Sequence, residues 1–203
     1  MNVLWTKIEA TLIYQKRYLF FLKGLENTLI LTLLSFLFAV LIGLLLCSSK
    51  RSPRTAISRA AGIISYALVE IPTLVLLMVF AYIVFAGSDI PIIMIAIIAL
   101  ALKEGAYLSA IFQTALETVS PGEIEAARTL GMNKWQAFRY VCLPQATAVA
   151  MPLCRNQFVG TLQETSVVGY LAIMDLTRAS SVVAARTMDA FFGLFIVTLA
   201  YFA

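Results

Sequence analysis

Five ionisable side chains lie inside long apolar stretches of this sequence: Glu70, Lys103, Glu104, Arg155 and Glu164. An ionised group within a membrane span costs roughly 2.5–3.5 kcal/mol on insertion scales. Such a group therefore normally faces a water-filled cavity or a partner. These residues are the first candidates for contact with a polar or charged solute.

The apolar stretch over residues 149–174 has one polar face. At about 100° per residue in a helix, its polar and small residues fall within an arc of about 160°. Arg155 lies outside this arc. A half-polar helix favours the wall of a solute path, whereas hydrogen bonds between packed helices are the alternative. The arc consists of Asn156, Gln157, Gly160, Thr161, Gln163 and Glu164.

A fixed negative charge beside small residues suits a cationic group. Glu164 could hold the ammonium of a zwitterion or a basic side chain, and it would disfavour acidic solutes because like charges repel strongly at low dielectric. Glu104 could play the same role. Alternatively, Glu164 pairs with a lysine or arginine on a neighbouring helix and meets no solute.

Two other apolar stretches contain charges. Lys103 and Glu104 are adjacent, so in a helix they point about 100° apart and do not form a direct pair. The small residues Gly105 and Ser109 are four apart, which predicts close helix packing. Glu70 lies near Pro72; a span broken beside a charge can mark a site, and a simple proline kink is the alternative.

The elements that position these residues are predicted membrane spans. Of the 203 residues, 61% are hydrophobic and 13% charged, whereas soluble domains have about 45–50% and about 25%. We expect an all-α, multi-pass transmembrane bundle of about five spans, preceded by an interfacial segment over residues 1–23. That segment has Trp5, Ile8, Leu12, Leu19 and Leu22 at helical spacing. The spans are expected over residues 25–47, 60–86, 92–116, 149–174 and 190–203.

Several kinds of chemistry are not expected. The chain has no histidine, the commonest metal ligand and neutral-pH proton carrier. The cysteines at 47, 142 and 154 are scattered among apolar residues and are interpreted as small hydrophobes rather than ligands or disulfide partners. We therefore expect no metal site, no bound cofactor and no catalytic activity in this chain.

Basic residues predict the orientation. Seven lysines and arginines occupy two segments on the same side by parity, residues 50–59 and 128–139, and two, Arg178 and Arg186, lie opposite. Because positive loops stay cytoplasmic, these segments are predicted inside and the N-terminus outside. Four basic residues before the first span oppose this orientation.

The polar stretch over residues 117–145 has an ordered construction. Ser120, Pro121 and Glu123 predict a capped helix start with a capping box. Gly131 is placed to end that helix in a left-handed conformation, and Asn133 can cap a second short helix that ends before Pro144. An amphipathic helix lying on the membrane is the alternative.

This loop resembles the EAA motif of type I permeases in ATP-binding cassette (ABC) importers, a MetI-like fold. The motif is Glu-Ala-Ala, three residues, Gly, nine residues, an aliphatic residue, one residue, Leu-Pro. The spacing is matched throughout, with Val141 as the aliphatic residue, by Glu125, Ala126, Ala127, Gly131, Leu143 and Pro144.

The resemblance implies the partners and the localisation. The loop would be the coupling helix that docks on an ATP-hydrolysing subunit, which binds the ATP and Mg. A second permease, identical or related, would complete the path, and an extracytoplasmic binding protein would deliver the solute. The chain would lie in lipid in the cytoplasmic membrane and bind no nucleic acid.

Further segments resemble the polar amino acid uptake branch. They are Gly105-Ala106-Tyr107-Leu108, Pro144-Gln145, Asn156-Gln157-Phe158 and Thr165-Ser166-Val167. The chain departs from that branch at Ala110, Gln113, Gln163 and Glu164, and at the Val-Glu-Ile that precedes Pro72. Amino acids are the expected substrate; another small solute, or an ion-coupled secondary transporter, which should show paired repeats, are the alternatives.

Overall fold

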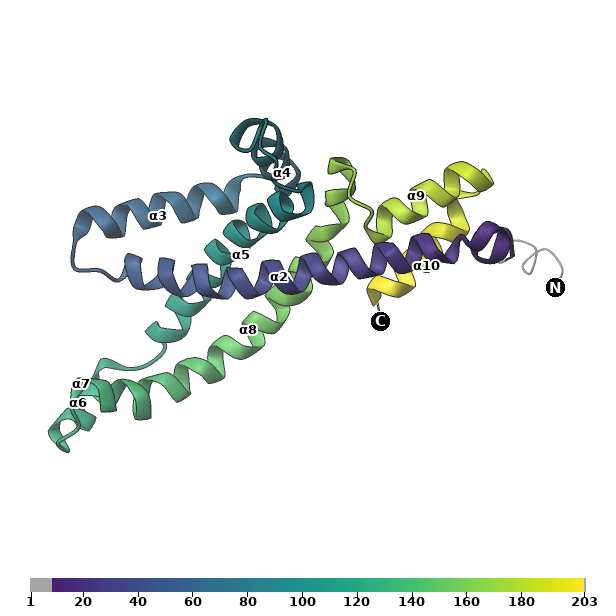
Figure 1. Cartoon of the computed structure of the whole chain (residues 1–203). Coiled ribbons are helices and arrows are strands. Elements are labelled where there is room, and N and C mark those ends of the chain that lie inside the picture. The colour runs from purple at the N-terminus through teal and green to yellow at the C-terminus, as the bar shows by residue number, and fades with distance from the viewer. Residues whose placement is uncertain (1–8, 203) are drawn as a thin grey trace. The chain divides into compact units, whose positions relative to one another are not determined.

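The computed structural model describes residues 9–202, and all regular secondary structure in that range is helical, which confirms the all-α class (Figure 1). The elements in chain order are η1 (Glu9–Ile13), η2 (Tyr14–Lys16), α2 (Tyr18–Lys50), α3 (Thr55–Glu70), α4 (Thr73–Val79), η3 (Phe80–Val84), α5 (Ile92–Glu117), α6 (Pro121–Thr129), α7 (Lys134–Ala137), η4 (Phe138–Cys142), α8 (Leu143–Glu164), η5 (Thr165–Leu171), α9 (Leu176–Thr187) and α10 (Ala190–Phe202).

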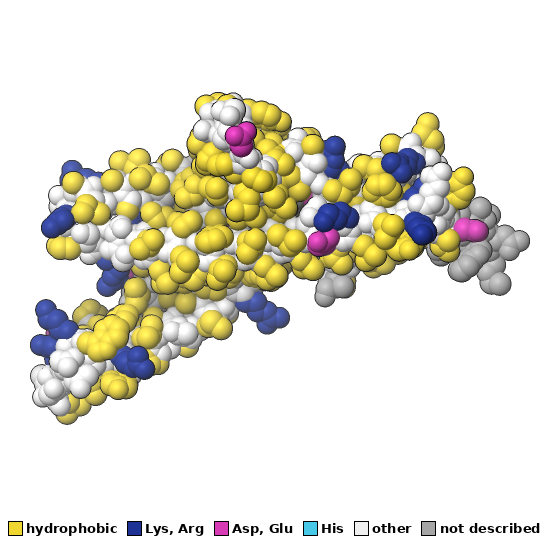
Figure 2. All heavy atoms as spheres, in the orientation of Figure 1, with side chains coloured by type: hydrophobic (Ala, Val, Ile, Leu, Met, Phe, Trp, Pro, Cys, Tyr) yellow, Lys and Arg dark blue, Asp and Glu magenta, His cyan; other side chains and the backbone are white. Residues whose placement is uncertain are grey.

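The described residues divide into two compact units. The first unit comprises residues 9–34, 72–99 and 161–202, and the second unit comprises residues 35–71 and 100–160. The surface in view is largely hydrophobic, as Figure 2 shows, with lysines and arginines where α6 and α7 lie and also around α9 and the start of α2. Such a surface is stable in lipid rather than in water.

Two of the described helices, α2 and α5, are long and apolar enough to cross a membrane. The number rises to four if each of two interrupted helix pairs forms a single span, α3 with α4–η3 and α7–η5 with α9. α10 is a shorter apolar helix of 13 residues. Five spans therefore remain a prediction.

The first helix begins earlier than expected. α2 starts at Tyr18 rather than near residue 25, because the apolar run over residues 18–22 continues the same helix. Leu19 and Leu22, expected in the interfacial segment, belong to α2, and Leu12 lies in η1. The interfacial position of residues 1–23 stays a prediction. Trp5 and Ile8 lie outside the described residues.

In the second unit, small residues bring α2 and α5 into close contact. A Cβ added to Gly43 of α2 would lie 2.9 Å from Leu108 Cβ, and one added to Gly105 of α5 would lie 2.6 Å from Ile42 Cγ2. Nearby, Lys50 Nζ donates to Ser109 Oγ over 2.8 Å. The predicted close packing around Gly105 is confirmed.

The predicted span over residues 60–86 is not one helix. α3 ends at Glu70 and α4 begins at Thr73, with Ile71 and Pro72 extended between them (ψ 125° and 137°). Proline has no N–H to donate and moves the preceding residue out of the helical region. The chain is therefore broken here, and a simple proline kink is excluded.

The polar segment after residue 175 is also helical, although a loop was expected there. Asp175 caps α9 by accepting hydrogen bonds from the backbone N–H groups of Thr177 and Arg178, over 3.1 and 3.0 Å. Within the first unit, α2 contacts the residues just before α9: Asn27 Nδ2 donates to the Met174 carbonyl over 2.8 Å. The helix buries Leu176, Ala179, Ser180 and Val183, at helical spacing.

All three cysteines are free; Cys47 and Cys142 are buried and Cys154 is partly exposed. Their burial is typical of cysteines that pack as small hydrophobes.

Candidate functional site

The loop over residues 117–145, which contains the EAA motif (the motif loop), starts differently from the prediction. Ser120 occupies the N-cap of α6, but its side chain makes no capping hydrogen bond. The Glu123 carboxylate, expected to complete a capping box, instead accepts from Gln145 Nε2 over 2.5 Å. This bond joins the first turn of α6 to the first turn of α8, so it closes the loop at its base.

The turn at Gly131 is a Schellman motif. Gly131 has φ +89°, its N–H donates to the Arg128 carbonyl over 3.1 Å, and the Met132 N–H donates to the Ala127 carbonyl over 3.2 Å. These bonds satisfy the carbonyls that end α6. The left-handed end predicted at Gly131 is confirmed, because glycine adopts this φ without a Cβ penalty.

The second short helix begins with the predicted capping box. Asn133 Oδ1 accepts from the Gln136 N–H, and Gln136 Oε1 accepts from the Asn133 N–H, each over 2.9 Å. The chain then continues without interruption through η4 into α8. Pro144 therefore lies within this continuous helical stretch, directly after the π-helical turn η4, rather than marking a gap between two helices.

The motif residues differ in exposure. Glu125 and Ala126 are exposed and Ala127 is buried, while Leu143 and Pro144 are exposed at the start of α8. Sequence reasoning missed a set of large apolar side chains displayed by the same loop. Leu130, Trp135 and Tyr140 are 82%, 64% and 65% exposed. Exposed aromatic and aliphatic groups of this kind are typical of a surface that contacts another protein or a membrane.

Two of the candidate path residues meet in the second unit. Gln157 Nε2 of α8 donates to Glu104 Oε2 of α5 over 2.6 Å, and Glu104 is fully buried. Its neighbour Lys103 is also buried and donates to the Ile71 carbonyl over 3.0 Å, at the C-terminal end of α3. The two adjacent charges thus have separate partners, as their angular separation predicted, and the lysine stabilises the negative end of α3.

The first unit holds the other acidic candidate. Thr73 Oγ1, in the first turn of α4, donates to Glu164 Oε2 over 3.0 Å. Thr161 is fully buried, whereas Asn156 and Arg155 of the second unit are exposed. Glu70 is exposed at the last residue of α3. Thr73 was not singled out from the sequence, although its position directly after Pro72 was a usable signal.

Comparisons with known proteins identify the family. The model of the family described as "binding-protein-dependent transport system inner membrane component" matches residues 35–203. A probable amino-acid permease, YxeN of Bacillus subtilis (strain 168), is 31% identical over 188 residues, which cover 89% of this chain and 82% of the relative. A putative glutamine transport system permease of Rickettsia felis is 28% identical, covering 93% and 88%.

Solved structures give the same result. A chain from the crystal structure of an amino acid ABC transporter with histidines is 33% identical, with a TM-score of 0.84, and the match covers 93% of this chain and 89% of that one. A chain of the MetNI methionine ABC transporter in an inward-facing conformation shares the fold, at 20% identity and a TM-score of 0.66, covering 91% and 94%. The chain belongs to the family of inner-membrane components of binding-protein-dependent transport systems, as a type I ABC importer permease of the polar amino acid branch.

Proposed function

We propose that this permease translocates amino acids into the cell, driven by ATP hydrolysis in a partner subunit that docks on α6 and α7. The observation that carries the proposal is the motif loop, closed at both helix junctions and displaying exposed apolar side chains. ATP and Mg would be bound by the partner. A second permease subunit would complete the path, and a binding protein would deliver the substrate.

The construction of the loop suits the transmission of force. Converting a 99:1 population of two transporter states into 1:99 takes about 5.5 kcal/mol. A segment whose helix ends are satisfied by the Schellman motif at Gly131 and the capping box at Asn133 moves as one piece. The bond between Glu123 and Gln145 links that piece to the start of α8. A push on α6 would therefore reach the helix that carries Gln157 and Glu164.

The substrate assay is direct. In the purified complex with its binding protein, we expect one amino acid, or a small group of them, to stimulate ATP hydrolysis and to be taken up by proteoliposomes. Stimulation by a solute that is not an amino acid, with none by a full amino acid panel, would refute the substrate class.

Orientation is tested with two exposed serines. Ser88 lies in the turn between η3 and α5, and Ser120 makes no side-chain capping bond, so each accepts cysteine at little cost. We expect Ser88→Cys to react with an impermeant thiol reagent in intact cells, and Ser120→Cys only after permeabilisation. The wild-type chain, with its own three cysteines, supplies the background. The reverse pattern would invert the topology.

Glu164 is proposed to favour neutral polar or basic amino acids. Its carboxylate lies at the end of α8 against the first turn of α4, where a fixed negative charge would attract an ammonium group. We expect Glu164→Gln to raise the half-saturating concentration for a basic amino acid about tenfold. A factor of this size corresponds to the free energy of about one charged hydrogen bond. Uptake across an amino acid panel gives the measurement.

Thr73→Val is the matched variant for this test. It removes the hydrogen bond to Glu164 and keeps the negative charge, so selectivity should be retained even if the rate falls. If both variants lose uptake equally with an unchanged substrate profile, Glu164 acts only in helix packing and is not part of the substrate path.

A further inference from the structure

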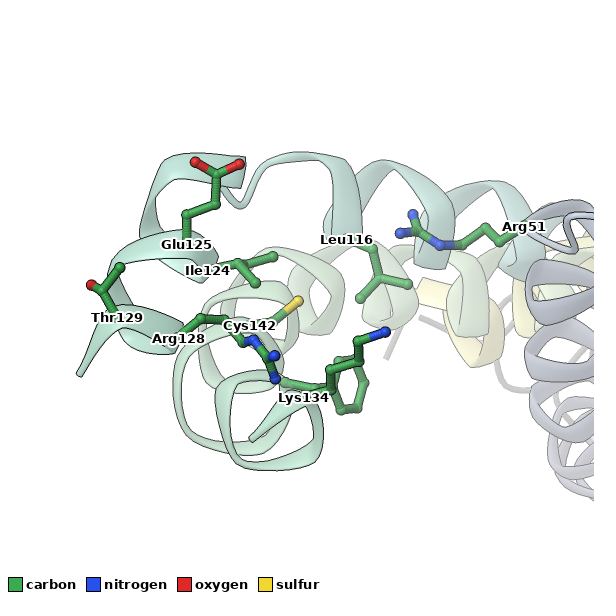
Figure 3. Close-up of a pocket in the computed structure, with 9 residues that line it drawn as sticks. Arg51, Leu116, Ile124, Glu125, Arg128, Thr129, Lys134 and Cys142 are labelled. Atoms are coloured by element: carbon green, nitrogen blue, oxygen red, sulfur yellow. The ribbon is translucent and has the colours of Figure 1, made fainter. Parts of the chain in front are cut away.

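A pocket lies beneath the motif loop. It has a volume of about 850 Å³ and is formed by the end of α5, by α6, by α7 with η4, and by Arg51, which follows α2. Its floor is apolar, with Leu116, Ile124 and Phe138. In Figure 3, Leu116, Ile124 and Cys142 lie at the centre of the group of side chains, in the space between the ribbons of these elements.

The rim of this pocket is cationic. Arg51, Arg128 and Lys134 contribute three positive charges from three different segments. One acidic residue, Glu125, also lines the pocket, but Figure 3 shows its carboxylate pointing away from the other side chains. The pocket therefore offers an apolar floor and a net positive rim, which suits an amphipathic anion.

A second cavity adjoins the first. It has a volume of about 370 Å³, lies between α2 and α5, and is lined by Leu44, Cys47, Ser48 and Phe112 together with Arg51 and Leu116. Arg51 and Leu116 line both cavities. The two cavities therefore adjoin at these residues. Together they are called the groove, whose part between α2 and α5 is largely apolar and whose part at the motif loop carries the cationic rim.

The apolar part of the groove adjoins a surface of exposed leucines, which suits contact with lipid. Leu37, Leu41, Leu44 and Leu45 of α2 are 58%, 54%, 52% and 67% exposed. Leu44 both belongs to this surface and lines the groove. An acyl chain can thus enter the groove from the hydrocarbon region without crossing a polar barrier.

We propose that this groove binds an anionic phospholipid of the cytoplasmic leaflet. The phosphate lies among Arg51, Arg128 and Lys134, and one acyl chain lies along Leu44, Cys47 and Phe112. Phosphate is strongly attracted to clustered Lys and Arg side chains. The proposal rests on the cytoplasmic orientation of the loop proposed above. Because α6 and α7 form the pocket wall, a bound lipid would brace the segment on which the ATPase docks.

The test measures lipid retention on the purified complex by native mass spectrometry, with phosphatidylglycerol and phosphatidylcholine as probes. Each cation near an anionic lipid contributes about fivefold in affinity. We expect the combined variant Arg51→Gln, Arg128→Gln and Lys134→Gln to bind phosphatidylglycerol about 100-fold more weakly, with phosphatidylcholine unchanged. The control removes the same charge from exposed positions outside the groove, Arg54→Gln, Arg59→Gln and Arg155→Gln.

A second variant tests the acyl part of the site without changing charge. Ser48 is exposed and lines the groove, so Ser48→Phe should fill it and reduce retention of the diacyl lipid, while glycerol phosphate fails to compete in the wild type. Equal losses in the pocket and control variants would overturn the proposal. So would loss of the ATPase subunit from the pocket variant with lipid retention intact, because the rim would then be a protein contact. The lipid-retention measurement does not depend on transport activity. A negative result would therefore overturn the lipid site and leave the proposed transport function unaffected.

Discussion

Gly131→Asp is expected to abolish ATP-driven uptake while the permease remains assembled in the membrane. No atom lies within 4 Å of a Cβ added at Gly131, so the side chain meets no obstacle within the chain. A left-handed conformation costs a non-glycine residue about 1 kcal/mol, and aspartate tolerates it better than most. The loss would arise at the docked ATPase, where a charge would be placed beside the exposed Leu130.

Gly87→Asp is the matched control for this variant. Gly87 also has positive φ, at +74°, and open space around it, but it lies in the turn predicted to face outward. Both variants should be present at wild-type abundance, and only Gly131→Asp should lose substrate-stimulated ATP hydrolysis and uptake in proteoliposomes. Wild-type rates in an assembled Gly131→Asp complex would show that this loop does not couple the two subunits.

Gly105→Val is expected to prevent accumulation of folded permease. A Cβ at this position would lie 2.6 Å from Ile42 Cγ2, 2.8 Å from Ile42 Cβ and 3.2 Å from the Ala39 carbonyl oxygen. The nearest neighbours are the branch carbon and backbone of α2, which cannot move aside as a flexible side-chain end would. Overpacking of this kind costs about 1–3 kcal/mol or more. Membrane abundance and thermal unfolding of the purified complex would report the loss.

Gly62→Val adds the same side chain within α3, where nothing lies within 4 Å of the new Cβ. It also removes a glycine from a helix interior, which gains rather than loses stability, by about 0.5 kcal/mol. Its abundance should match the wild type. If Gly105→Val is equally abundant and melts at the same temperature, α2 and α5 are not in the backbone contact described here.

Local chemistry accounts for the parts of the fold that the sequence predicted well. The Schellman motif at Gly131 and the capping box at Asn133 involve bonds between residues at most five apart, so residue types and spacing were sufficient. The break at Pro72 was also visible as a proline within an apolar run. The sequence did not show whether Pro72 kinks the helix or breaks it. The extended backbone at Ile71 shows that it is a break.

The incorrect or missing predictions concern side chains whose partners lie far away in the sequence. Glu123 was assigned to its own helix start, but Gln145, 22 residues later, takes its carboxylate. α9 was missed because two arginines made it resemble a loop, although Asp175 before Leu176 was a readable cap. The pairing of Gln157 with Glu104 spans 53 residues. The helical arc placed Gln157 on the polar face without indicating which residue it would contact.

The buried face of α2 shows a different limit. Both faces of this helix are apolar, so hydrophobic periodicity could not distinguish lipid from protein. Side-chain size distinguishes them, because the inward positions in the second unit are Ser35, Ala39, Gly43 and Cys47 at intervals of four. Leucines occupy the outward positions.

The closed ends of the motif loop bear on the thermodynamics of docking. A segment that orders only on contact loses conformational entropy at that moment, and this loss weakens association. Here the carbonyls of Ala126, Ala127 and Arg128 near the end of α6 already have partners within the chain, and so do the N–H groups of Asn133 and Gln136 at the start of α7. The ATPase would therefore dock on a loop that is already ordered. The heat capacity change on docking should match the apolar area buried at the contact, with no additional contribution from folding.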